Sequence, residues 1–308
     1  MIRQSIKVKH LIKQSQMPSW SQILDDVQTF QDQVGRLNVL RQQYIEAISQ
    51  ITGRNVIAYY SGWLKAENIP NVIINDQDVN AFMNAIHGLD HSKGLDLILH
   101  TPGGNVAATE CIVNYLKSVF GGNIRAIIPQ LSMSCGTMIA LSCKEIIMGC
   151  QSSLGPIDPH FNGLACQAIL DEFQHAIADA TRNPASLGIW NNIISKYHPT
   201  LLGECANAVK WSESLATEWL KVVNPAIDMD GIKKTFISHA DSYSHSRHIS
   251  REECKKVGLN IVELESNSDL QDAVLSLHHC YMILFDKWRY SKIVENHIGG
   301  RFLQMYSE

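Results

Sequence analysis

The sequence predicts an α/β protein with a largely parallel sheet, and residues 95–148 provide the main evidence. This stretch contains three short apolar runs, at 95–100, 124–128 and 145–148, which have the length and composition of buried strands. A glycine turn and a helical pattern follow the first run, and a serine turn and a second helical pattern follow the next. Strands that alternate with helices are joined by right-handed crossovers and pair in parallel. Helical spacing returns on both sides of this core, so we expect helical flanks.

The segment 19–52 carries apolar side chains at helical spacing, beginning at Ile23 and ending at Ile51. Ser21, with two aspartates in the following turns, predicts a capped start, and Gly53 predicts the end. We therefore expect one long amphipathic helix. Its apolar face could cover the core or pair with another subunit.

Further elements follow along the chain in a regular order. Residues 56–60 read as a strand, and the sequence NDQD at 75–78 predicts the cap of a helix that extends to Ile86. Two prolines and two glycines exclude regular structure across most of residues 152–163. A short strand is expected near 259–264, and helical patterns occupy residues 168–178, 189–197, 201–222 and 269–285. We divide the chain into a helical segment (1–52), an α/β core (53–180) and a mainly helical region (181–308).

Composition excludes several classes of protein. Of the 308 residues, 45% are hydrophobic and 18% are charged, as in an ordered globular chain. A formal net charge of −4 argues against a general nucleic-acid binder. No apolar run approaches the ~20 residues of a membrane span, and the basic opening segment lacks the apolar stretch of a secretory signal. Because the eight cysteines form no CxxC pair and no HExxH occurs, we expect a cytoplasmic protein with reduced cysteines, no metal and no cofactor.

The turn Thr101-Pro102-Gly103-Gly104 follows the strand predicted at 95–100. Two glycines let the backbone turn tightly with its N–H groups exposed, and a helix is expected to begin close by at Asn105. Such a turn can hold the negative charge that develops in acyl transfer. Taken alone, it could equally be a strand-to-helix connection that binds nothing.

A serine turn, SMSCGT at 132–137, lies between the second strand and its helix. Taken alone, a serine here would most simply cap that helix, and Ser132 could be the N-cap. However, neighbouring parallel strands present their carboxyl ends at the same edge of a sheet, so the two turns should face each other. Ser134 would then be a nucleophile, and the N–H of Cys135 would complete an oxyanion hole with the glycine turn. The pairing predicts a serine peptidase.

These turns, together with SSLGPIDP at 152–159, resemble the Clp-protease and signal-peptide-peptidase superfamily. Within it, the chain is most similar to the serine dehydrogenase proteinase family of bacteria. TGRNVIAYYSGW, KYHPTLLGEC and LQDAVLSLHHCYM are among the segments that extend the resemblance over about residues 45–300. The resemblance implies a ClpP/crotonase-like core, a β-β-α superhelix with helical flanks. It also implies an ATP-independent endopeptidase that acts on protein or peptide substrates and forms a homo-oligomer. By that resemblance Ser134 is the nucleophile, and Gly103, Gly104 and Cys135 supply backbone donors.

The general base is the open part of this prediction. A serine nucleophile needs a proton acceptor, and related peptidases take a histidine or lysine from the segment after the second helix. His160 follows the GPIDP loop, and His175 lies in the next predicted helix; either could instead be a surface residue. A later cluster of His239, His245 and His248 could bind a peptide terminus, although polar contacts with the core are the simpler interpretation.

Two other functions remain compatible with the sequence. Because no base is obvious, the chain could be a catalytically silent scaffold that keeps the fold for assembly. Crotonase-type acyl-CoA hydratases and isomerases also hold a carbonyl with paired amides, but they use acidic residues near the hole. The turns at 101–105 and 132–137 contain no glutamate, which disfavours that reaction.

Overall fold

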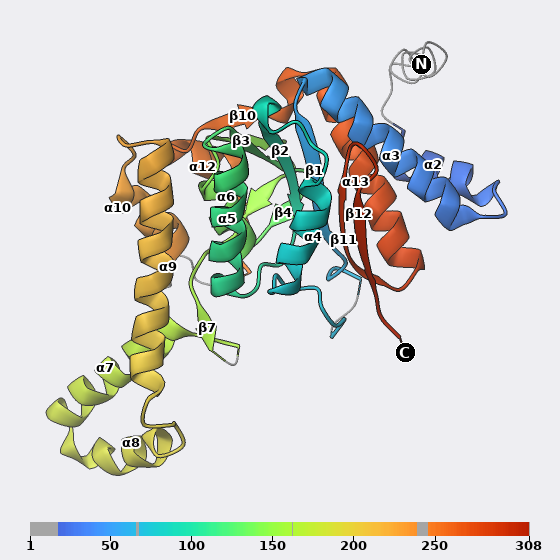
Figure 1. Cartoon of the computed structure of the whole chain (residues 1–308). Coiled ribbons are helices and arrows are strands. Elements are labelled where there is room, and N and C mark those ends of the chain that lie inside the picture. The colour runs from blue at the N-terminus through green and yellow to red at the C-terminus, as the bar shows by residue number, and fades with distance from the viewer. Residues whose placement is uncertain (1–17, 66–67, 162, 239–245, 308) are drawn as a thin grey trace.

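The computed structural model describes residues 18–65, 68–161, 163–238 and 246–307. Figure 1 shows a central sheet between two layers of helices, with a helical arm that extends away from one side of it. Across these residues the main sheet has seven strands. In order from one edge they are β10 (Ile261–Glu263), β5 (Glu145–Met148), β3 (Ile124–Ile128), β2 (Leu95–His100), β1 (Asn55–Ser61), β11 (Tyr290–Asn296) and β12 (Arg301–Met305).

The strands from β10 to β1 are mutually parallel, whereas β11 and β12 are antiparallel to their neighbours. The predicted α/β class with a mainly parallel sheet is therefore confirmed. Short strands form two smaller sheets, one of β4 (Leu131–Ser132), β6 (Ser153–Leu154) and β9 (Ile249–Ser250), the other of β7 (His160–Phe161) and β8 (Leu164–Ala165).

Helices cover both faces of the main sheet and form the arm. They are α2 (Trp20–Gln28), α3 (Gln33–Thr52), α4 (Gln77–Ile86), α5 (Val106–Phe120), α6 (Cys135–Leu141), α7 (Cys166–Arg182), α8 (Leu187–Ile194), α9 (Leu201–Val223), α10 (Met229–Ile232), α12 (Arg251–Lys256) and α13 (Ser268–Lys287). Short helical turns occur at His91–Lys93, Pro184–Ser186, Lys233–Ile237 and Leu264–Ser266. None of the helices within the described ranges is long and apolar enough to cross a membrane.

The sheet separates two apolar cores. Ile57 and Tyr59 of β1 point toward the side covered by α4, α5 and α6, whereas Ala58 and Tyr60 point toward α3 and α13. This alternation continues along β2, β3 and β5, because successive side chains of a strand face opposite sides of the sheet. Strands buried on both faces read as continuous apolar runs, which is why the sequence predicts them well.

The N-terminal segment forms two helices and not the single helix expected over 19–52. The cap of the first is Ser19, in a capping box, and not Ser21. The break comes at Asp32, whose side chain accepts a hydrogen bond from the Gly35 N–H and starts α3. Gly53 ends that helix in a left-handed conformation, as predicted. The apolar side chains of α2 and α3 pack against α13 of the same chain, so this face is already covered.

The C-terminal region, residues 181–308, differs most from the expectation of a mainly helical structure. Three of its segments belong to the main sheet: β10, which agrees with the strand expected near 259–264, and β11 and β12, which were not expected. β11 was not predicted because Lys292, Glu295 and Asn296 interrupt its apolar residues and make it look like a polar segment, although all three are buried. The helices α7, α8, α9 and α13 agree with the predicted helical segments to within a few residues.

Candidate active site

The glycine turn and the serine turn lie side by side at the carboxyl edge of the parallel strands. The Thr101 N–H donates to the Leu131 carbonyl (3.2 Å), and the Met133 N–H donates to the Thr101 carbonyl (2.9 Å). A Cβ atom placed on Gly103 would lie 2.6 Å from Cβ of Ser134. The structure therefore brings Gly103 against Ser134, and only a residue without a side chain fits there.

Ser134 has an unusual backbone conformation for a residue with a side chain. Its φ is +50° and its ψ is −118°, a strained combination that is uncommon outside glycine. The residue occupies the N-cap position of α6, but its side chain makes no capping hydrogen bond and is partly exposed. The side chain of Ser134 therefore does not cap α6, contrary to the simpler interpretation of this residue. A sharp strand-to-helix turn of this kind is how some hydrolases expose a nucleophile.

Not every predicted backbone donor is available. The Gly103 N–H donates to Oγ1 of Thr101 at 3.1 Å, so it is already used within the chain. In the described part of the chain, no carbonyl or carboxylate oxygen accepts from the N–H of Gly104 or of Cys135. The Cys135 thiol also donates to the Gly104 carbonyl (3.1 Å), which ties these two residues together. The donors that an oxyanion could use are thus those of Gly104 and Cys135, without Gly103.

A third segment holds the glycine turn from its other side. The Ile74 N–H donates to the Gly103 carbonyl (2.8 Å), and the Asn105 N–H donates to the Ile74 carbonyl (2.9 Å). A Cβ atom on Gly104 would lie only 2.3–2.8 Å from backbone atoms of Ile74. The side chain of Asn105 then caps α5 by accepting from the Ala108 N–H. The glycine turn is therefore fixed between residue 74 and the serine turn.

The loop that leads to His160 packs against the serine turn. Oγ1 of Thr137 accepts a hydrogen bond from the Gly155 N–H at 2.9 Å, and Gly155 lies directly against the side chain of Met133. Farther along, the Ile157 N–H donates to the Phe236 carbonyl (2.7 Å), and Asp158 is buried. The start of this irregular segment is consequently fixed relative to Ser134.

The two candidate bases have different surroundings. His160 is exposed on β7, and its Nδ1 lies 3.1 Å from the carbonyl oxygen of Asp158. Since a carbonyl oxygen only accepts, this contact favours the ring form with the proton on Nδ1, in which Nε2 is the basic nitrogen.

His175 is exposed in the middle of α7, and its ring packs edge-on at 5.7 Å from the ring of Trp190 in α8. Figure 1 shows α7 and α8 in the arm, away from α6. Within one chain, the structure does not bring His175 to Ser134. Of the later histidines, His248 is exposed, while His239 and His245 lie outside the described residues.

A pair of buried histidines lies behind the glycine turn, at the end of β2. The ring centroids of His100 and His278 are 5.2 Å apart, and the ring of Trp63 lies 4.3 Å from that of His100. Burial lowers the pKa of His100 well below its usual value and lowers the pKa of His278 to about 3. Both rings are therefore neutral at pH 7.

We expect the protein to lose stability as the pH falls below about 6.5, the value of an unfolded histidine. Between that pH and about 3, the unfolded chain binds a proton at His278 that the folded chain does not bind. The free energy of unfolding should then fall by about 1.4 kcal/mol per pH unit for each such histidine. Urea unfolding at pH 7.5 and pH 5 measures this slope. His278→Gln should give a shallower slope, and an unchanged slope would contradict the assignment.

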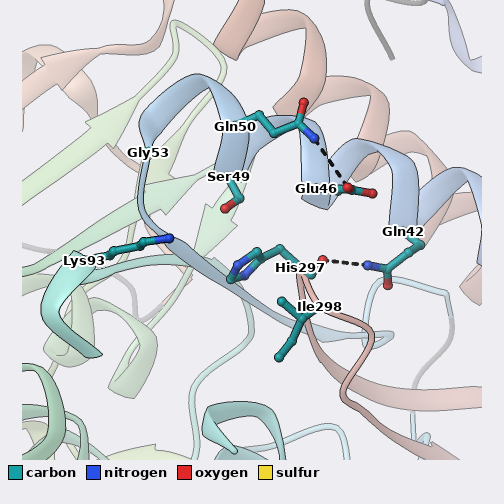
Figure 2. Close-up of a pocket in the computed structure, with 8 residues that line it drawn as sticks. All are labelled: Gln42, Glu46, Ser49, Gln50, Gly53, Lys93, His297 and Ile298. Carbon is teal, nitrogen blue, oxygen red and sulfur yellow. Dashed lines mark hydrogen bonds between the residues drawn. The ribbon is translucent and has the colours of Figure 1, made fainter. Parts of the chain in front are cut away.

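A pocket lies at the opposite end of the sheet from the two turns. Figure 2 shows a pocket beside the amino end of β1, lined by residues of α3 and by Lys93, His297 and Ile298. In this pocket Gln42 donates to the His297 carbonyl (2.8 Å). Its lining includes none of the candidate site residues. No group of three potential metal ligands occurs among the residues that the structure describes.

Comparison with known proteins gives one family match. The model of the ClpP-like SDH-type serine proteinase family matches residues 27–187, a range that includes both turns and the loop after them. The uncharacterized protein MJ0137 of Methanocaldococcus jannaschii is 28% identical over 194 residues, which are 61% of this chain and 60% of that protein. The uncharacterized protein MJ1495 of the same organism is 36% identical over 100 residues, 32% of this chain and 34% of that protein. The chain thus matches less than two thirds of the length of either relative.

Proposed function

Because the chain belongs to the ClpP-like SDH-type serine proteinase family, we propose that it hydrolyses peptide bonds through an acyl-enzyme on Ser134. The observation that carries this proposal is the conformation of Ser134, strained, uncapped and partly exposed against a glycine turn. Family membership also supports a ClpP/crotonase-like β-β-α superhelix, in which β3, β4 and α6 form one repeat of the core.

In the proposed reaction, Oγ of Ser134 attacks the carbonyl carbon of the scissile peptide bond, and its proton passes to a base. The N–H groups of Gly104 and Cys135 hold the oxyanion of the tetrahedral intermediate. When that intermediate collapses, the C–N bond breaks and the protonated base gives its proton to the leaving amine. Water then attacks the ester carbonyl on Ser134 while the same base takes a proton from it. As the ester C–O bond breaks, the base returns that proton to Oγ of Ser134 and the carboxylic acid product leaves.

For the base we propose His160 in place of His175. The loop before His160 is fixed to the serine turn through Thr137 and Gly155, and the contact with the Asp158 carbonyl orients the ring. A hydrogen bond on Nδ1 is the usual way to hold a catalytic imidazole in its productive form. His175 has no comparable connection to the serine turn.

The test is labelling of the purified chain with a fluorophosphonate, followed by mass spectrometry of the peptide that carries Ser134. A covalent adduct on Ser134 supports the proposal, because only an activated serine reacts readily with this probe. If no serine is labelled and a peptide library is not cleaved, the catalytically silent scaffold becomes the better interpretation.

We further propose that the chain forms a homo-oligomer through its arm. The face of α2 and α3 is covered by α13, but Ile177, Leu187 and Ile189 of the arm are more than half exposed. No residue of α8 is buried. Contiguous exposed apolar surface is typical of interaction sites, and these three residues belong to the neighbouring helices α7 and α8. Light scattering at micromolar concentration should give a multiple of 34.5 kDa, and Leu187→Glu with Ile189→Glu should lower it; a monomeric wild type would refute the proposal.

A further inference from the structure

A buried ion pair lies behind the glycine turn. Lys292 of β11 and Asp78 of α4 are both fully buried, and Nζ of Lys292 lies 2.7 and 2.8 Å from the two carboxylate oxygens. The third hydrogen of the ammonium goes to the Ile73 carbonyl at 2.9 Å. A buried ion pair seldom stabilises a protein more than apolar residues of the same size, because both charges lose their hydration. Its presence at this position therefore suggests a task other than stability.

The first connection from the ion pair to the glycine turn runs through the backbone of residues 73–75. Lys292 holds the Ile73 carbonyl, and Asp78 accepts from the Asn75 N–H at 3.0 Å. The residue between them is Ile74, whose N–H and carbonyl pair with the residues on either side of Gly104. The ion pair thus holds both ends of the short segment against which Gly104 is packed.

The second connection runs through two hydroxyl groups. The Tyr59 hydroxyl donates to Oδ2 of Asp78 at 2.9 Å. The side chain of Thr101 lies beside this hydroxyl, and its Oγ1 accepts from the Gly103 N–H at 3.1 Å. Burial and the nearby Asp78 carboxylate raise the pKa of Tyr59 well above its usual value, so the hydroxyl keeps its proton. The Thr101 hydroxyl, which lies beside Tyr59, occupies the Gly103 N–H and leaves that of Gly104 for a substrate.

We propose that Asp78, Lys292, Tyr59 and Thr101 are positioning residues, which hold the Gly103–Gly104 turn in the geometry that the oxyanion requires. The inference rests on the proposed peptidase function. It adds to that function a set of residues away from the substrate, which determine which glycine N–H is free to bind the oxyanion.

The same strand carries a matched control on its opposite face. Glu295 of β11 forms a buried ion pair with Arg41 of α3 (2.7 Å), and the Tyr281 hydroxyl donates to Oε1 of Glu295 at 2.6 Å. This pair has the same chemistry as the first, a buried carboxylate with a cation and a tyrosine. The hydrogen bonds found for Arg41 and Glu295 in the described ranges involve Asn38 and Tyr281, not either turn.

The experiment compares Tyr59→Phe with Tyr281→Phe. Each change removes one hydroxyl that donates a hydrogen bond to a buried carboxylate, so both variants should unfold at a lower urea concentration than the wild type. Only Tyr59→Phe should lower kcat, by about 10–100-fold with little change of KM, because small displacements of an oxyanion donor have effects of that size. Thr101→Val should behave like Tyr59→Phe, and Thr101→Ser, which keeps the oxygen, should restore kcat. Equal kcat in both tyrosine variants would overturn the inference.

A second measurement separates this inference from the proposed function. Hydrogen exchange of the amides at 101–105 reports the order of the turn whether or not the chain cleaves peptides. We expect faster exchange there in Tyr59→Phe and wild-type exchange in Tyr281→Phe. If exchange changes in this way while the wild type neither cleaves peptides nor reacts with a fluorophosphonate, the peptidase proposal fails and the structural link stands. Unchanged exchange in Tyr59→Phe would refute the link itself.

Discussion

Replacement of Ser134 by alanine is expected to abolish fluorophosphonate labelling and to lower peptide turnover by about 10⁴-fold or more, as loss of the nucleophile does in well-studied serine peptidases. The reason is that Ser134 Oγ forms the covalent bond in the proposed mechanism, and no other group of the turn can replace it. The loss should be in kcat, measured on a fluorogenic peptide, because the residue contributes little to the binding of the ground state.

Ser132 provides the matched control for this prediction. It precedes Ser134 by two residues and belongs to the same turn, but it is fully buried and its Oγ has no hydrogen-bond partner among the described residues. Ser132→Ala should therefore retain labelling and most of the turnover. Equal labelling of the wild type and Ser134→Ala would show that the probe reacts elsewhere and would contradict the assignment of the nucleophile.

The sequence was sufficient to predict the architecture around the two turns, for a physical reason. β2 and β3 are short runs of apolar residues buried on both faces, so composition alone identifies them. Once two neighbouring strands are taken as parallel, their following turns must meet at one edge. That rule predicted the approach of Gly103 to Ser134, which the close contact between the two residues now reflects.

Elements that depend on buried polar groups could not be predicted in the same way. Lys292 and Glu295 make β11 read as a polar segment, and their partners Asp78 and Arg41 lie more than 200 residues earlier in the chain. No local pattern connects residues at such a separation. The same limit concealed the positioning residues behind the glycine turn, although two charged residues in strand-like surroundings were a visible signal.

The hydrogen bonds at the site also could not be predicted from the sequence. A Pro-Gly-Gly turn offers two N–H groups, and the amino-acid sequence does not show which one is left without a hydrogen bond inside the protein. The choice depends on the Thr101 hydroxyl, which accepts from Gly103 because the threonine is buried beside Tyr59. Likewise, spacing from Ser134 could not separate His160 from His175. The difference arises from the arm, which carries α7 away from the core.

Replacement of Gly104 by alanine is expected to have the largest effect on folding. The new Cβ would lie 2.3–2.8 Å from backbone atoms of Ile74, a distance that real Cβ atoms do not adopt. Relief requires the backbone of residues 73–75 to move, and that backbone is held by Lys292 and Asp78. We expect a loss of about 3 kcal/mol or more in the free energy of unfolding. Turnover should also fall sharply, because the proposed oxyanion donor is displaced.

Substitutions at two other glycines show how much of that loss of stability comes from steric overlap of the new Cβ atom and how much from backbone conformation. Gly121 has a φ of +61° and a ψ of −143°, a combination nearly confined to glycine, but open space where a Cβ atom would lie, so Gly121→Ala should cost about 2 kcal/mol for the strained backbone alone. Gly122 has neither restriction, and Gly122→Ala should be neutral or stabilising by up to about 1 kcal/mol. The expected order of urea midpoints, from highest to lowest, is therefore Gly122→Ala, then Gly121→Ala, then Gly104→Ala. A midpoint for Gly104→Ala equal to that of Gly121→Ala would mean that residues 73–75 yield easily, and the ion pair would then not hold the turn.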